Sequence, residues 1–121
     1  MVDLTLVDLP GLVNVQIQGQ HHGIIEDVKR MVTSFVARPN SLILVVIPAN
    51  QDIANQGSLN LVKQCDPTGT RTIAVITKID IMDRGCNALE MLEGKAFPLK
   101  HGYHGVKLRS KLDIDNKMTI Q

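Results

Sequence analysis

The chain is poor in aromatic residues and in cysteine, and it contains no long apolar run. Of its 121 residues none is Trp, two are Phe and one is Tyr, so the core has to be built from aliphatic side chains. Its two cysteines, Cys65 and Cys86, lack a CxxC pattern. That spacing argues against a disulfide framework and fits a reducing compartment. The longest aliphatic run, residues 42–47, is too short to cross a bilayer.

Positive and negative charges nearly cancel in total. There are 13 Lys and Arg against 12 Asp and Glu, a net charge of +1, and 44% of the residues are hydrophobic. This composition argues against an intrinsically disordered chain and against a strongly basic nucleic-acid module, so no nucleic-acid partner is expected. The start of the chain lacks the basic flank and cleavage site of a signal peptide, and we expect a cytoplasmic location.

Apolar runs alternate with amphipathic segments. We predict strands at residues 4–8, 42–47 and 72–77, with a weaker one at 105–108, and helices at 24–35, 58–65 and 87–93. The runs at 42–47 and 72–77 have no polar alternation, which is typical of strands covered on both faces of a parallel sheet. The sequence therefore predicts an α/β fold with a mostly parallel sheet and right-handed crossovers.

The distinctive polar residues follow the predicted strands. In such sheets ligands bind at the carboxyl ends of the strands. The residues at these ends are Asp8, Asn50 with Asp52, Lys78 with Asp80, and Arg109 with Ser110.

The segment Asp8-Leu-Pro-Gly11 places a carboxylate and a glycine N–H together after the first predicted strand. This pair suits a hydrated magnesium ion and a terminal phosphate oxygen. An Asx-turn with a purely structural role explains the same four residues about as well.

The segment Thr77-Lys-Ile-Asp80 is more specific. One carboxylate accepts hydrogen bonds from two adjacent N–H donors of a guanine edge, while the lysine stem covers the face of the ring. An ordinary strand-to-helix cap is the alternative interpretation. The two segments support each other because each follows a predicted strand and they occur in this order.

With these residues in view, the chain resembles part of the GTPase domain of the dynamin family over essentially its whole length. The matching blocks are Leu4-Thr-Leu-Val-Asp-Leu-Pro-Gly11, Asn40-Ser-Leu-Ile-Leu44, Pro48-Ala-Asn-Gln-Asp-Ile-Ala-Asn55, Asp66-Pro-Thr-Gly-Thr-Arg-Thr-Ile73, Thr77-Lys-Ile-Asp-Ile-Met-Asp83 and Arg109-Ser110. The resemblance implies a P-loop GTPase-type fold with flanking helices, and GTP binding and hydrolysis in membrane remodelling such as fission, fusion or trafficking.

The resemblance also implies roles for single residues. Asp8 would lie near Mg²⁺, holding it through water, and the Gly11 N–H would lie at the γ-phosphate and the attacking water. The residues that would hold guanine are Thr77, Lys78, Asp80, Arg109 and Ser110. Asp83 would reach the base bound in a facing partner, and Asp52 would support the catalytic loops across a dimer of GTPase domains.

The partners implied are a second GTPase domain and, through regions outside these 121 residues, a membrane. A cytoskeletal partner is a further candidate. The location implied for the whole protein is the cytoplasm, with peripheral attachment to membranes.

Some of the family's pattern is absent from these residues. The phosphate loop GxxxxGK[ST] and the first switch precede the Asp-x-x-Gly strand in the family, and neither occurs here. We therefore expect residues 1–121 to be a partial GTPase domain, inactive alone, with a gap in its sheet between residues 4–8 and 42–47. This hypothesis of a partial sequence predicts that 1–121 alone is not a well-folded monomer. Leu108 and Lys111 stand where the family usually has amides, so the resemblance leaves open whether guanine is recognised there.

Two other functions stay open at this point. A degenerate GTPase-like module would bind a guanine nucleotide without turnover. An unrelated doubly wound α/β domain would show no preference for GTP over ATP. His21-His22 and the pair His101 and His104 are interpreted as solvated loop residues, with a shared metal ion as the less favoured alternative.

Overall fold

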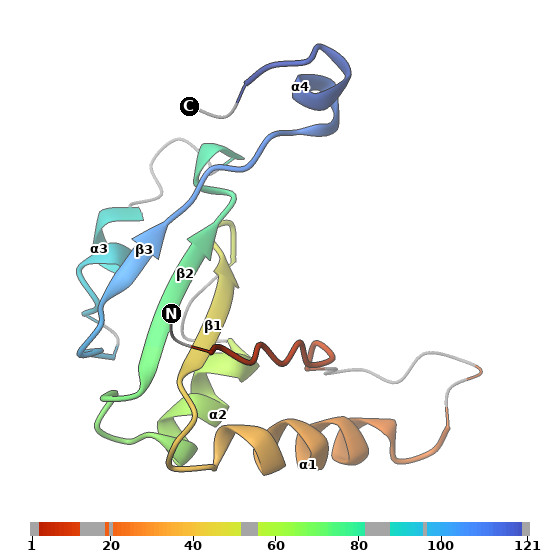
Figure 1. Ribbon diagram of the computed structural model, residues 1–121, viewed down its shortest axis with the longest axis vertical. Coiled ribbons are helices and arrows are strands. Elements are labelled where there is room, and N and C mark those ends of the chain that lie inside the picture. Colours follow the sequence, from red (N-terminus) through yellow and green to blue (C-terminus); the bar gives the residue numbers. More distant parts are fainter. Residues whose placement is uncertain are drawn as a thin grey trace. The chain divides into compact units, whose positions relative to one another are not determined.

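A computed structural model describes residues 3–12, 19, 21–51, 56–81, 88–95 and 97–119 (Figure 1). The chain divides into two compact units, residues 1–41 and residues 42–121. Each unit is described by itself below.

The first unit contains one helix, α1, over Ile24–Val36. It begins after Gly23, whose φ of 95° is left-handed and whose carbonyl accepts from the Asp27 N–H at 3.0 Å. Val28 and Val32 lie one turn apart and are buried, as the apolar spacing predicts. The helix ends before Pro39, so the predicted helix is confirmed with one further residue at its end.

The predicted strand at residues 4–8 is wrong. Residues 3–12 have no regular secondary structure, and the side chains of Leu4, Leu6 and Val7 are more than half exposed. A strand exists only where its N–H and C=O groups pair with a neighbouring strand. Among the residues described, no strand pairs with this segment.

The second unit is built on a parallel sheet with the strand order β1-β2-β3 (Figure 1). Strand β1 is Ile43–Pro48, β2 is Thr72–Thr77 and β3 is Tyr103–Gly105. The first two confirm the predictions to within one residue. The expected strand at 105–108 is wrong in position: Ile76 pairs with Gly105 and β2 ends one residue later, so the residues beyond 106 have no strand to pair with.

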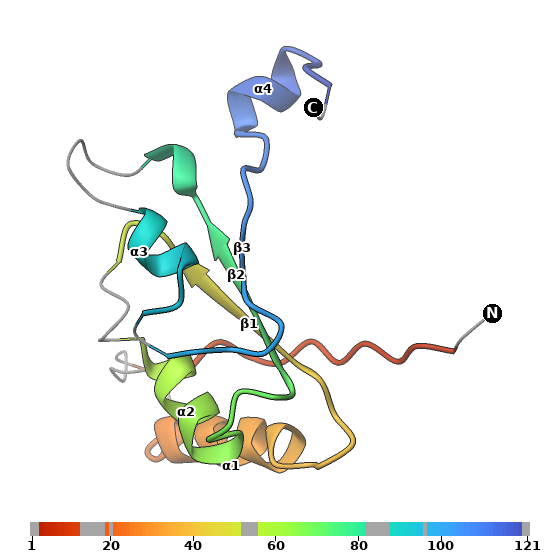
Figure 2. The ribbon, with the colours of Figure 1, turned by 90° about the vertical axis from the view of Figure 1, so that its left-hand side faces the viewer.

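Helices cover one face of this sheet. Helix α2, Gly57–Cys65, packs on β1, and helix α3, Ala88–Leu92, packs on β3. Figure 2 shows α2 and α3 on the same side. This arrangement is expected because successive right-handed crossovers that move in one direction place their helices on one face.

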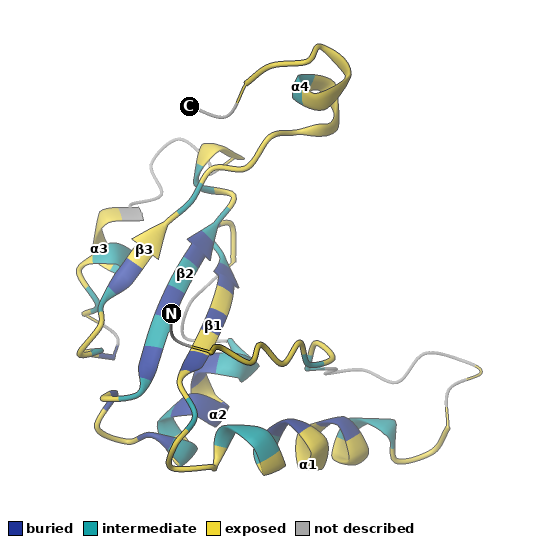
Figure 3. Ribbon diagram, viewed as in Figure 1, coloured by how far each residue is buried: buried dark blue, intermediate teal, exposed yellow. Residues whose placement is uncertain are grey.

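The other face of the sheet is open, which corrects the expectation that both faces of the strands are covered. Along β1, Ile43, Val45 and Ile47 are buried, whereas Leu44 and Val46 are exposed (Figure 3). The alternate residues of β2 are only half-buried on that face. The physical reason is that no helix of the second unit's described residues packs there.

The remaining elements are short. A 3-10 helix, η2, covers Ile79–Ile81, and helix α4 covers Lys111–Asp115. Across the described part of the chain, no helix is both long enough and apolar enough to span a membrane.

Candidate functional site

The carboxyl end of β2 carries three of the predicted guanine-binding residues. Thr77 is the last residue of the strand, and its carbonyl accepts a 2.8 Å hydrogen bond from the Ala49 N–H that follows β1. The Thr77 hydroxyl lies 3.5 Å from the Ile47 carbonyl. These contacts fix the end of β2 against the end of β1, so the residues that follow start from a defined point.

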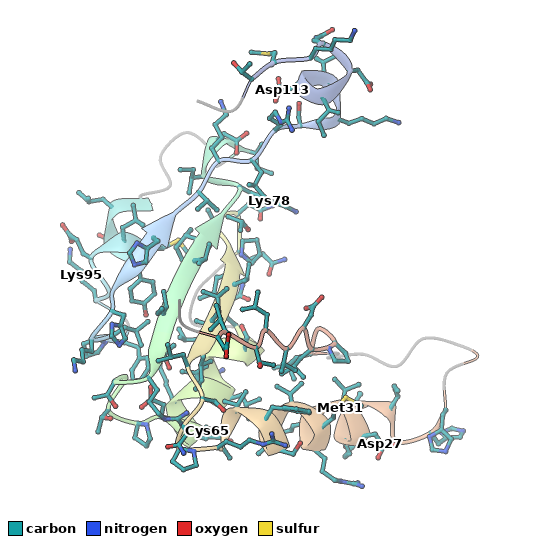
Figure 4. The ribbon with its side chains drawn as sticks, viewed as in Figure 1. Asp27, Met31, Cys65, Lys78, Lys95 and Asp113 are labelled. Atoms are coloured by element: carbon teal, nitrogen blue, oxygen red, sulfur yellow. The ribbon has the colours of Figure 1, made fainter. Side chains whose placement is uncertain are left out.

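The chain turns sharply after Thr77. Lys78, labelled in Figure 4, has a φ of 58°, and its carbonyl accepts from the Ile81 N–H at 3.2 Å to close η2. Ile79 lies beside β3, since a Cβ added to Gly105 would be 3.6 Å from the Ile79 Cδ1 atom. The turn therefore directs Ile79 toward the sheet and leaves Lys78 and Asp80 exposed.

The Asp80 carboxylate makes no hydrogen bond or ion pair with any other described residue, and the same holds for the Lys78 ammonium group. An exposed carboxylate without a partner has its acceptor oxygens available to a ligand. The structure thus brings Thr77, Lys78 and Asp80 together at one strand end, in the order that the sequence predicts.

Asp8 and Gly11 belong to the first unit, which the structure describes separately from the β2 turn. Both are exposed, and no atom of the described chain lies within 4 Å of a Cβ built on Gly11. The placement of these two residues against Thr77, Lys78 and Asp80 stays a prediction.

Arg109 and Ser110 have local roles beside α4. Ser110 forms a capping box with Asp113: its hydroxyl accepts from the Asp113 N–H at 3.2 Å, and the Asp113 Oδ2 atom accepts from the Ser110 N–H at 2.8 Å. The hydrogen bonds from the Ser110 N–H and hydroxyl hold the pKa of Asp113 below its usual value. Arg109 donates to the Met118 carbonyl at 3.0 Å. Their contact with guanine stays a prediction.

Two predicted site residues, Asp52 and Asp83, lie outside the described residues. Within the described ranges, no group of three or more His, Cys, Asp or Glu side chains is placed to hold a metal ion. His101 and His104 each place a ring nitrogen near a backbone carbonyl, that of Thr70 at 3.1 Å and that of His101 at 3.0 Å. A metal ion held by Asp8 would accordingly need water and phosphate oxygens as its other ligands.

The sequence interpretation gave no role to Asp66, the most buried carboxylate described. Asp66 follows α2 and is 3% exposed. Its Oδ2 atom accepts from the Arg71 N–H at 2.9 Å and the Thr72 hydroxyl at 2.8 Å, and its Oδ1 atom accepts from the Thr70 N–H at 3.2 Å. The alternation Thr68, Thr70, Thr72 after an aspartate was the available signal.

Burial alone would raise the pKa of Asp66, but the hydrogen bonds together outweigh burial. The Thr72 hydroxyl, the N–H groups of Arg71 and Thr70 and the charge of Arg71 lower the pKa below its usual value. The ionised carboxylate therefore fixes the turn between α2 and the amino end of β2. This is the opposite end of the strand from Lys78 and Asp80, about 16 Å away for six extended residues.

The same turn holds the segment that leads into β3. The Gly69 carbonyl accepts from the Lys100 N–H at 2.9 Å, and a Cβ on Gly69 would come within 2.6 Å of the Pro98 carbonyl oxygen. Gly69 also has a φ of 61°, which glycine adopts without strain. This glycine is required both by the conformation and by the close approach of the two segments.

Known proteins resemble the chain over its whole length. The sequence model of the dynamin family matches residues 1–79, and that of the dynamin central region matches residues 87–121. Phragmoplastin DRP1A of Arabidopsis thaliana is 46% identical over 99% of the chain, dynamin-related protein DNM1 of Saccharomyces cerevisiae 49% over 100%, and dynamin-2 of Bos taurus 48% over 100%.

The chain spans only 20%, 16% and 14% of the length of these three relatives, respectively. Its three-stranded parallel sheet with flanking helices agrees with a partial P-loop GTPase domain, the fold class expected from the sequence. Since the model of the family covers more than half of the residues, the chain belongs to the dynamin family.

Proposed function

We propose that residues 1–121 form part of a dynamin-type GTPase domain, and that the whole protein binds GTP with Mg²⁺, hydrolyses it and remodels membranes. The observation that carries this proposal is the turn after β2, where Lys78 and Asp80 are exposed beside the anchored Thr77. Membership of the dynamin family supports the same function.

Asp80 selects the base in this proposal. Its two carboxylate oxygens accept from the N1–H and N2–H groups of guanine, and the Lys78 stem covers the ring. Adenine has an acceptor at N1 and no amino group at position 2, so a carboxylate facing that edge loses both hydrogen bonds and meets a repulsive lone pair. Thr77 contributes by holding the start of the turn against β1, and Arg109 and Ser110 complete the base site.

Asp8 and Gly11 serve the phosphate end. A single exposed carboxylate fits Mg²⁺, which keeps several waters and takes phosphate oxygens as further ligands. When bound, Mg²⁺ would neutralise charge on the phosphate oxygens. The Gly11 N–H donates to the γ-phosphate and helps to place the water for in-line attack. The phosphate loop that this chemistry needs is not among the 121 residues.

Assembly completes the proposed reaction. Two GTPase domains would face each other, with Asp83 reaching the partner's base and Asp52 supporting the catalytic loops. The match to the dynamin central region supports self-association. Contact with membranes, and with any cytoskeletal partner, would come from segments outside these residues, with the protein on the cytoplasmic side.

Replacing Asp80 with asparagine in the full-length protein tests this proposal. The amide of Asn accepts from N1–H but donates toward position 2, so it repels the guanine amino group and suits the carbonyl of xanthine. We expect a loss of GTP affinity of about 100-fold, from about 3 kcal/mol for hydrogen bonds to a charged group, and a gain for XTP. The measurement is competition against a fluorescent GTP analogue.

Asp115→Asn is the matched control, because Asp115 is an exposed carboxylate on α4 to which we assign no ligand contact. It should leave both affinities unchanged. Unaltered GTP binding by Asp80→Asn would contradict the proposed base site.

A second candidate function rests on Leu108, which is 71% exposed where the family has an amide. In a degenerate module the full-length protein would bind guanine nucleotides without turnover. Phosphate release measured at rising protein concentration separates the two: stimulated turnover supports the GTPase, and binding with no turnover supports the module.

A further inference from the structure

Two residues other than glycine have a left-handed backbone among those that the structure describes. Lys78 has a φ of 58° and Lys117 a φ of 54°. This conformation is unfavourable for residues with a Cβ atom, and glycine or asparagine adopts it more readily. A lysine at such a position therefore calls for an explanation.

Lys117 is explained by the end of a helix. It follows Asn116, the C-cap of α4, and its N–H donates to the Ile114 carbonyl at 3.0 Å, while the Met118 N–H donates to the Asp113 carbonyl at 2.9 Å. This is the Schellman arrangement, in which the residue after the cap is left-handed. The hydrogen bonds at the helix end offset the unfavourable conformation.

Lys78 has no such explanation. It follows a strand, and the residues on either side are held by the sheet: the Thr77 carbonyl bonds to the Ala49 N–H, and Ile79 lies beside Gly105. Between the strand and η2, the left-handed conformation falls on Lys78. Its ammonium group makes no hydrogen bond or ion pair in the described chain that would offset the strain.

We propose that the left-handed backbone of Lys78 is strained and lowers the stability of the fold, and that it is kept because it places a lysine side chain beside the ligand-binding carboxylate of Asp80. Glycine at this position would make the fold more stable and the binding site weaker. The inference rests on the proposed function for the identity of the ligand, a guanine nucleotide, but the strain is a property of the chain alone.

Thermal unfolding of the full-length protein without nucleotide tests the strain. The variants are Lys78→Gly, Lys78→Asn and Lys78→Ala, and the matched controls are Lys117→Gly and Lys117→Ala. We expect the melting temperature of the unit that contains β2 to rise by about 2–8 °C with glycine at either position, less with asparagine, and not with alanine, which keeps the Cβ atom. Both glycine variants loosen the unfolded chain equally, so this effect cancels in the comparison.

Titration with a fluorescent GDP analogue tests whether the Lys78 side chain contributes to nucleotide binding. All three Lys78 variants should lose affinity by about tenfold or more, the order expected for one lost contact of a charged group, while both Lys117 variants bind as the wild type does. Higher stability with weaker binding in Lys78→Gly supports the proposal.

Three results would each contradict a different part of the reasoning. A melting temperature of Lys78→Gly and Lys78→Asn at or below that of the wild type, with Lys117→Gly raised, would overturn the strain. A stabilised Lys78→Gly with full affinity would overturn the role of the side chain. No binding by the wild type, with Lys78→Gly stabilised, would refute the proposed function and support the strain.

Discussion

Replacing Asp66 with asparagine is expected to loosen the turn between α2 and β2, although the two side chains have the same size. In the wild type one carboxylate oxygen accepts from the Arg71 N–H and the Thr72 hydroxyl, and the other accepts from the Thr70 N–H. Asparagine has only one oxygen. Whichever way its amide is oriented, the NH₂ group faces a backbone N–H that has lost its acceptor.

The magnitude follows from burial. Asp66 is 3% exposed, so water cannot replace the missing acceptor. An unsatisfied buried donor costs about 1–3 kcal/mol, and losing the charge weakens the hydrogen bonds that remain. We expect a total of about 2–4 kcal/mol, which corresponds to a 30- to 1,000-fold increase in the opening equilibrium of the turn. Hydrogen exchange of the amides at residues 68–72 in the full-length protein measures this increase.

Asp113→Asn is the matched control. The Asp113 Oδ2 atom accepts from the Ser110 N–H and hydroxyl, both at 2.8 Å, a pair of donors like that of the Asp66 Oδ2 atom, but these hydrogen bonds are exposed and Asp113 is only half-buried. Water replaces the lost acceptor there, so exchange should rise only around α4 and by less. Equal exchange at residues 68–72 in the wild type and Asp66→Asn would refute the argument from burial.

Three further predictions concern the pH dependence of stability, the close contact between Gly69 and the Pro98 carbonyl, and the exposed face of the sheet. Because the pKa of Asp66 lies below its usual 3.8 in the folded chain, its stabilisation is present above that pH and is lost as the pH falls through the folded value. The melting temperature of Asp66→Asn should therefore fall less steeply with acid than that of the wild type; parallel profiles would contradict this. Gly69→Ala places a Cβ 2.6 Å from the Pro98 oxygen. It should lower the melting temperature more than Gly102→Ala, because Gly102 has a similar φ of 72° but nothing within 4 Å of an added Cβ. Equal losses would mean that the left-handed backbone alone, and not the clash with Pro98, causes the effect. Leu44→Thr in the full-length protein should leave the melting temperature unchanged, because Leu44 is 63% exposed; a lower melting temperature would mean that this face is covered.

Much of the fold was predictable because several helices and strands are marked by continuous apolar patterns within their own residues. The spacing of Val28 and Val32 predicts α1, and the aliphatic runs predict β1 and β2. The strand expected at residues 4–8 is also rich in Leu and Val, yet it is not formed. A helix satisfies its backbone from within, whereas a strand depends on a partner that its own residues do not specify. For the same reason, the run at 42–47 did not reveal that Leu44 and Val46 are exposed.

The location of Thr77, Lys78 and Asp80 was predictable, because Thr77 ends a predicted strand and the other two residues follow directly after it. The strain at Lys78 was not, because only glycine or asparagine marks a left-handed residue in a sequence. The direction of Ile79 toward Gly105 also depends on β3, which the sequence placed two residues too late.

The two ends of β2 show why residue type alone does not assign function. Asp66 and Asp80 flank the same strand, and each lies close to a threonine that begins or ends it. Asp66 is buried and its oxygens are occupied by backbone and hydroxyl donors, so no acceptor is left for a ligand. Asp80 is exposed and bonds to no other described residue. Ligands bind at the carboxyl ends of parallel strands. At this end of β2 the exposed carboxylate of Asp80 and the left-handed Lys78 lie two residues apart, which makes it the end to test for nucleotide.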